Sequence, residues 1–355
     1  KIQHGPLRLI FTVDEETNMT GALSLSADHV KDAKYVINCD SESIHVICVA
    51  SAGSCHMEFT RDLHRCAPTG DTALTVRAHA LAGGHSGEVI NEGRGNAIKA
   101  VADVLYRLSE GGVEYALADY KGGVAANAIP SDASAVVVVA AKDVDRVKAT
   151  VAAAEKDFNL VYGETDPNAV FEVMPADLPK SVLSAEDTTS IVDVINLLHC
   201  GVFAMDRRLP RLPALSASLG TIETREDVLA FQYFPRSSSD ARLQALVRVM
   251  PIMAKCTGTK VHIEKPFPAW TESKNSKLQA LMADAYKDVM GKEPRVEAMH
   301  GGLETGFLYA MNPDLDIVSV GPETHDIHSA DERVELDTVA QLVQVIAGTL
   351  ERLTK

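Results

Sequence analysis

A mostly apolar run near the start of the chain ends directly in three acidic residues. Residues 7–13 predict a β-strand, and Asp14, Glu15 and Glu16 follow it without a break. Adjacent carboxylates repel one another, and burying them in ionised form is costly unless a cation or a shared proton balances the charge. The stretch therefore has two interpretations, either a metal or proton-sharing site at the end of a strand, or an acidic turn at the edge of a sheet.

The residues up to position 50 predict a mainly parallel α/β sheet. Apolar strands at 7–13, 35–39 and 44–49 are separated by polar turns and by a short helix at 24–30. In such sheets the chemistry lies at the carboxyl ends of the strands. Asp40 follows the second strand as the acidic triplet follows the first, so we expect the acids to meet on one rim. This placement favours the metal interpretation.

A second unit begins near Gly70. Residues 72–81 alternate as a strand does, and the glycine-flanked His85 follows, where we expect a flexible, exposed tip. A histidine at such a tip either binds a ligand or is simply exposed. From there to residue 263 strands and helices recur in a β-α-β-β-α-β rhythm, which predicts two ferredoxin-like layers side by side.

The α/β pattern returns after a proline-rich segment at 266–268. We predict helices at 276–290 and 339–353 and a buried strand at 315–320, which runs into a loop rich in acids and histidines. The first and last segments therefore form one predicted domain, divided between residues 1–69 and 266–355. An α+β domain, residues 70–265, is inserted between them.

Composition narrows the class of partner. The chain has 34 Lys and Arg against 49 Asp and Glu, a net charge of −15, and shows no basic cluster, which argues against nucleic acid. The longest apolar runs, such as 135–141, are too short to span a bilayer, so no membrane insertion is expected. The six cysteines form no C-x-x-C pair and several lie in apolar runs, which favours a reducing, cytoplasmic location.

Seven short motifs stand out along the chain. In order they are Val13-Asp14-Glu15-Glu16, Asn38-Cys39-Asp40-Ser41-Glu42, Gly83-Gly84-His85-Ser86-Gly87, Gly95-Asn96-Ala97, Asn127-Ala128-Ile129-Pro130, His300-Gly301-Gly302-Leu303-Glu304 and His328-Ser329-x-Asp331-Glu332. Their types and order resemble those of the co-catalytic zinc peptidases of the aminoacylase and carnosinase type, most of all the Xaa-His dipeptidases. The resemblance covers residues 7–350.

The resemblance implies a two-zinc site. Glu16, Asp40 and His328 match metal ligands, although the motifs do not divide them between the two ions. Glu15 matches the general base that takes a proton from a water whose pKa the metal has lowered. His325 is the alternative metal histidine, but the Ser-x-Asp-Glu sequence follows His328.

The resemblance also implies a substrate-binding set on the inserted domain, which acts as a lid. His85, Asn127 and Arg236 match residues that hold the tetrahedral oxyanion or the substrate carboxylate, and His300 and Gly302 match a loop that lines the substrate pocket. Without the resemblance, Arg236 reads as a surface arginine at a helix start, Asn127 as a turn residue and His300 as a donor to a backbone carbonyl.

The implied activity is zinc-dependent hydrolysis of short peptides, chiefly dipeptides with C-terminal histidine. Members commonly pair through the lid, so a homodimer is expected. The sequence departs from the family because none of its twelve histidines is followed by x-Asp, and an upstream bridging aspartate is also missing. We therefore expect an upstream segment to be absent from the chain as written, with weak metal binding as the result.

Three interpretations follow from this departure. The chain is part of a zinc dipeptidase, or a truncated, non-catalytic homologue that binds a peptide or a partner, or a related amidohydrolase that acts on acyl-amino acids. The length of the predicted lid favours the dipeptidase over the amidohydrolase.

Overall fold

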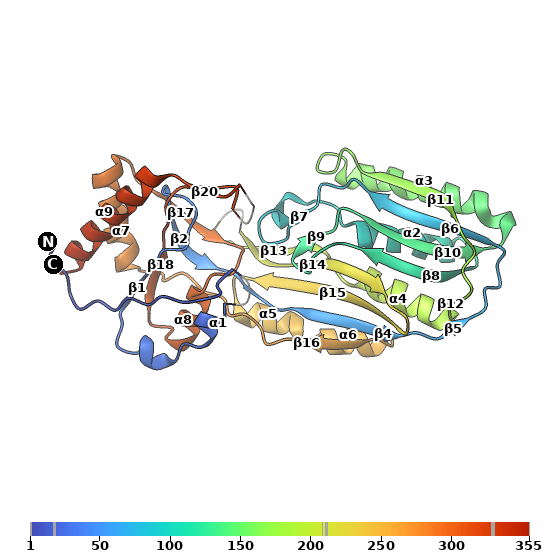
Figure 1. The fold of residues 1–355 in the computed structure, drawn as a ribbon, viewed down its shortest axis with the longest axis horizontal. Coiled ribbons are helices and arrows are strands. Elements are labelled where there is room, and N and C mark those ends of the chain that lie inside the picture. Colours follow the sequence, from blue (N-terminus) through green and yellow to red (C-terminus); the bar gives the residue numbers. More distant parts are fainter. Residues whose placement is uncertain (1, 17–18, 208, 210–211, 328–330, 355) are drawn as a thin grey trace.

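The computed structural model describes residues 2–16, 19–207, 209, 212–327 and 331–354 and forms two lobes side by side (Figure 1). One lobe is built on a four-stranded sheet and the other on a ten-stranded sheet, here called the small-sheet lobe and the large-sheet lobe. None of the described helices is both long enough and apolar enough to cross a membrane.

Both ends of the chain contribute to the small-sheet lobe. Its sheet has the order β1-β18-β2-β17, with parallel pairing of β1 to β18 and of β17 to β2 and an antiparallel contact between β18 and β2. Two long helices, α7 and α9, pack on β2 and β18 around buried Ile47, Met282 and Val345. The predicted α/β sheet is confirmed. The elements are α1 (Thr20–Leu23), η1 (Ala27–His29), β1 (Tyr35–Asn38), β2 (Val46–Ser51), α7 (Lys277–Met290), β17 (Arg295–Met299), α8 (Thr305–Met311), β18 (Asp316–Ser319), β19 (Thr324–His325), β20 (Arg333–Val334) and α9 (Leu336–Leu353).

The strand predicted at residues 7–13 is wrong. The structure has no helix or strand within residues 2–16, and Leu9 and Phe11 are 78% and 89% exposed. A strand needs a neighbour that takes its backbone hydrogen bonds, whereas here the Val13 carbonyl accepts from the Gly21 amide of a helical turn. Glu15 therefore lies in a turn and not at the end of a strand.

The large-sheet lobe consists of two β-α-β-β-α-β units joined edge to edge, as predicted, but its strand β4 (Met57–Asp62) lies before residue 70, the predicted start of the inserted domain. The first unit gives the strand order β11-β6-β10-β8 and the second gives β14-β15-β4-β16, with β8 pairing to β14 at the seam. The first unit lies within the sequence of the second, between β4 and α4. The first unit comprises β6 (Thr72–His79), α2 (Ala97–Glu110), β8 (Tyr115–Gly122), β10 (Ala133–Val139), α3 (Val144–Tyr162) and β11 (Val170–Ala176).

The second unit contains a helix that the sequence predicted as continuous. The sequence pattern of residues 241–255 predicts one helix, but the structure has two there, because Pro251 lies in the first turn of α6, where it removes a backbone donor. The unit comprises β4 (Met57–Asp62), α4 (Ala185–Leu197), β14 (Pro213–Thr224), β15 (Val228–Ser237), α5 (Asp240–Val247), α6 (Met250–Cys256) and β16 (Lys260–Ile263). Smaller elements are β3 (Gly53–Ser54), β5 (Arg65–Cys66), β7 (Gly84–His85), η2 (Ile90–Glu92), β9 (Ala128–Ile129), η3 (Ala141–Asp143), β12 (Val182–Leu183) and β13 (Gly201–Met205).

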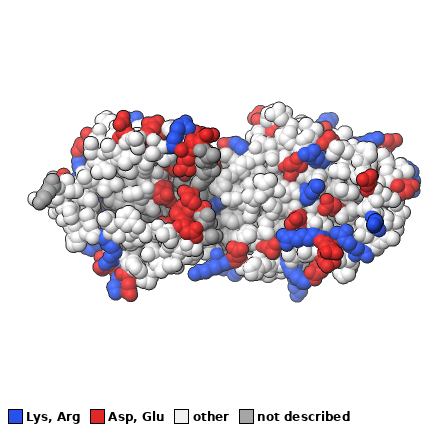
Figure 2. All heavy atoms as spheres, in the orientation of Figure 1, with Lys and Arg blue, Asp and Glu red and all other residues white. Residues whose placement is uncertain are grey.

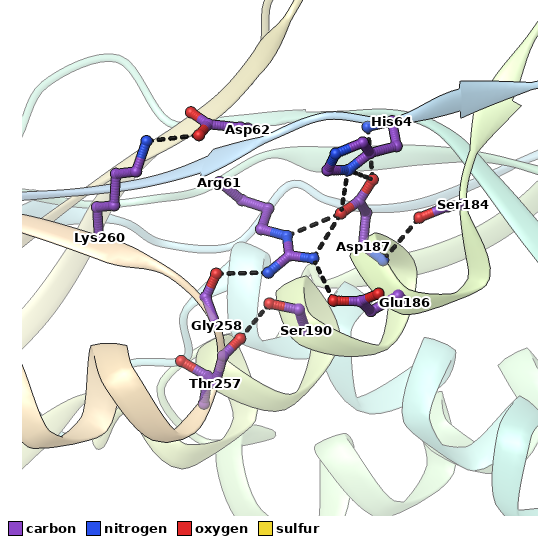
Figure 3. Close-up of polar contacts among 10 residues, drawn as sticks. All are labelled: Arg61, Asp62, His64, Ser184, Glu186, Asp187, Ser190, Thr257, Gly258 and Lys260. Carbon is purple, nitrogen blue, oxygen red and sulfur yellow. Dashed lines mark hydrogen bonds and ion pairs between the residues drawn. The ribbon is translucent and has the colours of Figure 1, made fainter.

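A buried arginine ties three elements of the second unit together (Figure 3). Arg61 of β4 donates to Asp187 Oδ1 at 2.8 Å, to Glu186 Oε1 at 3.1 Å and to the Gly258 carbonyl at 2.5 Å. The Asp187 side chain is fully buried and also accepts from the His64 amide at 2.6 Å. The start of α4, the end of β4 and the turn before β16 are therefore held by one ionic network.

Two hydrogen-bonded segments connect the lobes. Ser51 pairs with Trp270 and Ser54 pairs with Phe267 in antiparallel bridges, so the chain enters and leaves the large-sheet lobe through neighbouring strands. The Phe267 amide donates to the Ser54 carbonyl at 2.8 Å. The proline-rich segment at 266–268 is one side of this paired connection.

Candidate active site

A cleft of about 1680 Å³ lies between the lobes and is lined from both sides. Acidic side chains gather at the junction of the lobes on the small-sheet side (Figure 2). Eight of the residues singled out in the sequence line this cleft, namely Glu15, Glu16, Asp40, His85, Asn127, Arg236, His300 and Gly302. His328 lies outside the described residues.

The small-sheet wall of the cleft is acidic. Asp40 lies two residues beyond the end of β1, and its pKa is raised to about 7, first by burial and then by Glu15, Glu304 and Glu16. A buried carboxylate whose pKa is raised by neighbouring carboxylates is stabilised by a cation or by a shared proton. The expected convergence of acids on one rim is thus present.

The acidic wall fits a divalent cation in charge and in donor type, because carboxylate oxygens are common ligands of such ions. Within the described residues, however, no three His, Cys, Asp or Glu side chains are close enough to one another to hold a metal ion. The described part of the wall therefore supplies charge and donors, and a complete ligand set is not preformed in it.

Glu304 lies close enough to Asp40 to raise the pKa of that carboxyl, although the sequence analysis assigned Glu304 no role. Its Oε2 accepts a hydrogen bond from Thr12 Oγ1 at 2.8 Å, while its Oε1 is buried and has no hydrogen-bond partner within the described residues. The sequence contained a signal for Glu304, because this residue is the last of the His-Gly-Gly-Leu-Glu motif. Its position raises the number of acids around Asp40.

The large-sheet wall begins with His85, whose predicted place on a flexible, exposed tip is wrong. Gly83 and Gly84 adopt positive φ values of 62° and 121°, and this turn leads into β7, where His85 pairs with Ala128 of β9. The His85 side chain is 34% exposed. The Ser86 amide donates to the Asn127 carbonyl at 2.8 Å, so the two motifs lie side by side.

Arg236 is buried in the same wall. It lies on β15, is only 5% exposed, and stands over the ring of Phe234 with its guanidinium carbon 4.8 Å from the ring centroid. Burial lowers the pKa of Arg236 to about 10. Its Nη2 lies 3.3 Å from His85 Nε2, and its Nε is buried without an acceptor in the described structure. The interpretation as a surface arginine is therefore wrong.

His300 crosses from the small-sheet lobe to the other wall. It follows β17, is 6% exposed, and its Nε2 lies 2.7 Å from Ser216 Oγ of β14. Burial, followed by the charge of Arg236, lowers the pKa of His300 to about 3. Its partner is thus a hydroxyl and not the backbone carbonyl of the alternative interpretation. Ser216 had no signal in the sequence by itself.

Two further residues bear on the predicted ligands. At Gly302 an added Cβ would stand 3.2 Å from the Phe267 ring, so the loop lies close to the connection between the lobes.

His325, the alternative metal histidine, has an acidic partner outside the cleft lining. Its Nε2 lies 2.8 Å from Glu335 Oε1.

Comparisons with known proteins place this geometry in context. The model of peptidase family M20/M25/M40 matches residues 1–352. The cytosol non-specific dipeptidase of Escherichia coli (strain K12) is 28% identical over 355 residues, which are 99% of this chain and 72% of that protein. The succinyl-diaminopimelate desuccinylase of Pseudoalteromonas atlantica is 30% identical over 130 residues, 36% of this chain and 33% of that protein.

Among solved structures, the aminoacylhistidine dipeptidase from Vibrio alginolyticus superposes with a TM-score of 0.91 at 28% identity. The match covers 99% of this chain and 72% of that structure. The arrangement of a small-sheet lobe and a two-unit large-sheet lobe is therefore shared with that protein.

Proposed function

This chain belongs to peptidase family M20/M25/M40, and on that premise we propose that it hydrolyses short peptides, chiefly dipeptides with a C-terminal histidine. The observation that carries the proposal is the opposition of charge across one cleft, with Asp40 and its neighbouring carboxylates on one wall and buried Arg236 on the other. A peptide bound between these walls meets a cation for its carboxylate and acids for the chemistry at its amide.

We assign the metal ligands to Glu16, Asp40 and His328, with zinc as the ion and two ions in a complete site. When bound, such a metal lowers the pKa of a water and polarises the scissile carbonyl. Glu15 would serve as the general base, which accepts a proton from the attacking water and gives it to the leaving amine. The turn that holds Glu15 lies beside Asp40, which is consistent with this division of roles.

The large-sheet wall acts as the lid in this proposal. Arg236 binds the carboxylate of the substrate, because a buried guanidinium that has no carboxylate partner among the described residues gains most from one. His85 and Asn127 lie side by side and stabilise the developing oxyanion. The names of the two dipeptidases support the reaction, and that of the Escherichia coli protein supports a cytoplasmic location. We further propose a homodimer formed through the lid.

The experiment measures histidine release from Xaa-His dipeptides by the purified natural protein with added Zn²⁺. Glu15→Gln should lower kcat about 1000-fold, the scale expected for a lost general base, and a chelator should abolish turnover. Glu164→Gln, an exposed glutamate outside the cleft, is the matched control. The proposal is overturned if the protein releases no histidine, or if Glu15→Gln performs as the parent does.

The same assay decides between the two other interpretations. Turnover of acyl-amino acids without turnover of dipeptides would identify the amidohydrolase. Binding of a dipeptide without turnover of either class, in the presence of Zn²⁺, would identify the non-catalytic homologue.

A further inference from the structure

A hydrogen bond between side chains joins the two walls of the cleft at Ser216 and His300. Ser216 lies on β14, where it is 1% exposed and directly opposite Arg236 of β15 in the antiparallel register. Side chains of such a pair lie on the same face of the sheet with neighbouring Cβ atoms. The 2.7 Å contact with Ser216 therefore holds the His300 ring beside the Arg236 side chain.

The direction of this hydrogen bond follows from the hydroxyl. The proton of a buried hydroxyl needs an acceptor, since leaving it unpaired costs free energy. His300 Nε2 is the partner that the described structure gives Ser216 Oγ. Ser216 must then donate to Nε2. A neutral imidazole has one donor and one acceptor nitrogen, so the ring proton of His300 lies on Nδ1.

The protonated nitrogen has no acceptor of its own. His300 Nδ1 is buried and has no hydrogen-bond partner within the described residues, and the same is true of Arg236 Nε. The two residues are 6% and 5% exposed, and both line the cleft. Two buried donors without an acceptor form a site for a group that only accepts hydrogen bonds, and a carboxylate is such a group.

We infer that Ser216 is a positioning residue that fixes His300 as its Nδ1-protonated tautomer, so that His300 and Arg236 together donate to the carboxylate of the substrate. The part that concerns the substrate rests on the proposed function. The part that concerns the tautomer does not. Because Ser216 and His300 belong to different lobes, the donor is aligned only when the lobes hold the relative positions seen here.

The first experiment reads the tautomer directly. Long-range ¹H–¹⁵N spectra of histidine-labelled protein report which ring nitrogen carries the proton, and His300→Asn identifies the His300 signals. We expect a protonated Nδ1 and an unprotonated Nε2 in the parent and in Ser216→Thr, and loss of this fixed pattern in Ser216→Ala. A parent protein with the proton on Nε2, or a Ser216→Ala variant with the parental pattern, overturns the inference.

The second experiment reads the consequence for the substrate. Ser216→Ala should raise KM for Xaa-His dipeptides about tenfold, a loss of about 1.4 kcal/mol, and leave kcat within about twofold of the parent, while Ser216→Thr restores the parental KM. If Ser216→Ala changes only kcat, or if KM stays at the parental value although the tautomer has changed, His300 does not bind the substrate carboxylate in the way inferred here.

A matched control separates these effects from general damage. Ser190 of α4 is also a buried serine of the large-sheet lobe, and its hydroxyl donates to the Thr257 carbonyl away from the cleft. Ser190→Ala should leave both the tautomer and KM unchanged. If no dipeptide is turned over by any form, the proposed function fails, and the spectra still decide whether Ser216 sets the tautomer.

Discussion

Arg61 and Arg236 are buried arginines on adjacent strands of one sheet, and their surroundings are opposite. Arg61 on β4 is 9% exposed and donates to two carboxylates and a carbonyl. Arg236 on β15 is 5% exposed, touches a histidine and an aromatic ring, and has a buried Nε without an acceptor in the described structure. The burial of a charged side chain therefore does not by itself show whether that side chain stabilises the fold or binds a ligand.

The pKa values of the two guanidinium groups follow this difference. Burial acts to lower the pKa of Arg61, but Asp187 and Glu186 outweigh it and raise the pKa above the usual value. Burial of Arg236 is not offset in this way, and its pKa falls to about 10. A buried charge whose partners are all supplied by the fold serves the fold, whereas one that lacks them is available to a ligand.

The largest effect is expected for Arg61, whose hydrogen-bond partners are supplied by the fold. Arg61→Met leaves the Asp187 carboxylate buried without its cation, so the free energy of unfolding should fall by about 3 to 5 kcal/mol. Urea unfolding followed by circular dichroism measures it. The control is Lys260→Met, which breaks the exposed ion pair with Asp62 and should cost less than about 1 kcal/mol. Equal losses in the two variants would contradict the assignment.

A substitution of Arg236 should have the opposite effect, with little change in stability and a large loss of activity. Arg236→Gln removes a buried charge that has no carboxylate partner in the described part of the chain, so the free energy of unfolding should change by less than about 1 kcal/mol. At the same time kcat/KM for dipeptides should fall about 100-fold, or about 2.7 kcal/mol. Steady-state kinetics and urea unfolding of the same preparation measure both quantities. A stability loss as large as that of Arg61→Met would end the contrast between the two arginines.

The pH dependence of stability sharpens the comparison at His300. Its pKa in the folded protein is about 3, against a usual value of 6.5, so between these pH values the unfolded chain binds more protons and stability falls as the pH falls. At pH 4.5 this histidine should contribute about 2.5 kcal/mol less stability than at pH 7. The stability difference between the parent and His300→Asn should shift by that amount. An equal difference at both pH values would show that burial does not keep His300 neutral.

The smallest effect concerns the helix that carries Asp187. Ser184 is the N-cap of α4, and its Oγ accepts from the Asp187 amide at 3.1 Å (Figure 3). Ser184→Ala should lower the free energy of unfolding by about 1 kcal/mol, and Ser184→Asp should restore most of it. Kinetic constants should stay at parental values, since the helix start lies outside the cleft lining. A changed KM would show that the Arg61 network also supports the site.

The sequence predicted most of the fold because apolar periodicity reports which face of each element is buried. Ile98, Val101, Leu105 and Leu108 recur at helical spacing in the sequence, and all four are completely buried on α2. The apolar run at residues 7–13 misled the strand prediction, because such a run indicates a preference for an extended chain and says nothing about a neighbouring strand that would take its backbone hydrogen bonds. Leu9 and Phe11 are exposed for that reason.

The candidate site was predicted in part. Short motifs located part of the cleft lining, namely Glu15, Glu16, Asp40, His85, Asn127, His300 and Gly302, since each motif places its own polar groups at or near a turn or the end of a strand. They did not find Ser216, which meets His300 across 84 residues of sequence and from the other lobe. That contact depends on the register of β14 against β15 and on the relative position of the lobes, and neither is encoded locally.

The nesting of one unit inside the other bears on the order in which this protein folds. All strands of the first unit lie within residues 72–176, whereas Met57 of β4 must find Tyr233 of β15 across that whole insertion. Loop-closure entropy and contact order favour local pairing. We expect the first unit to form early and to bring the two halves of the second unit close to each other. β4 then joins its sheet late, and the cleft is assembled last.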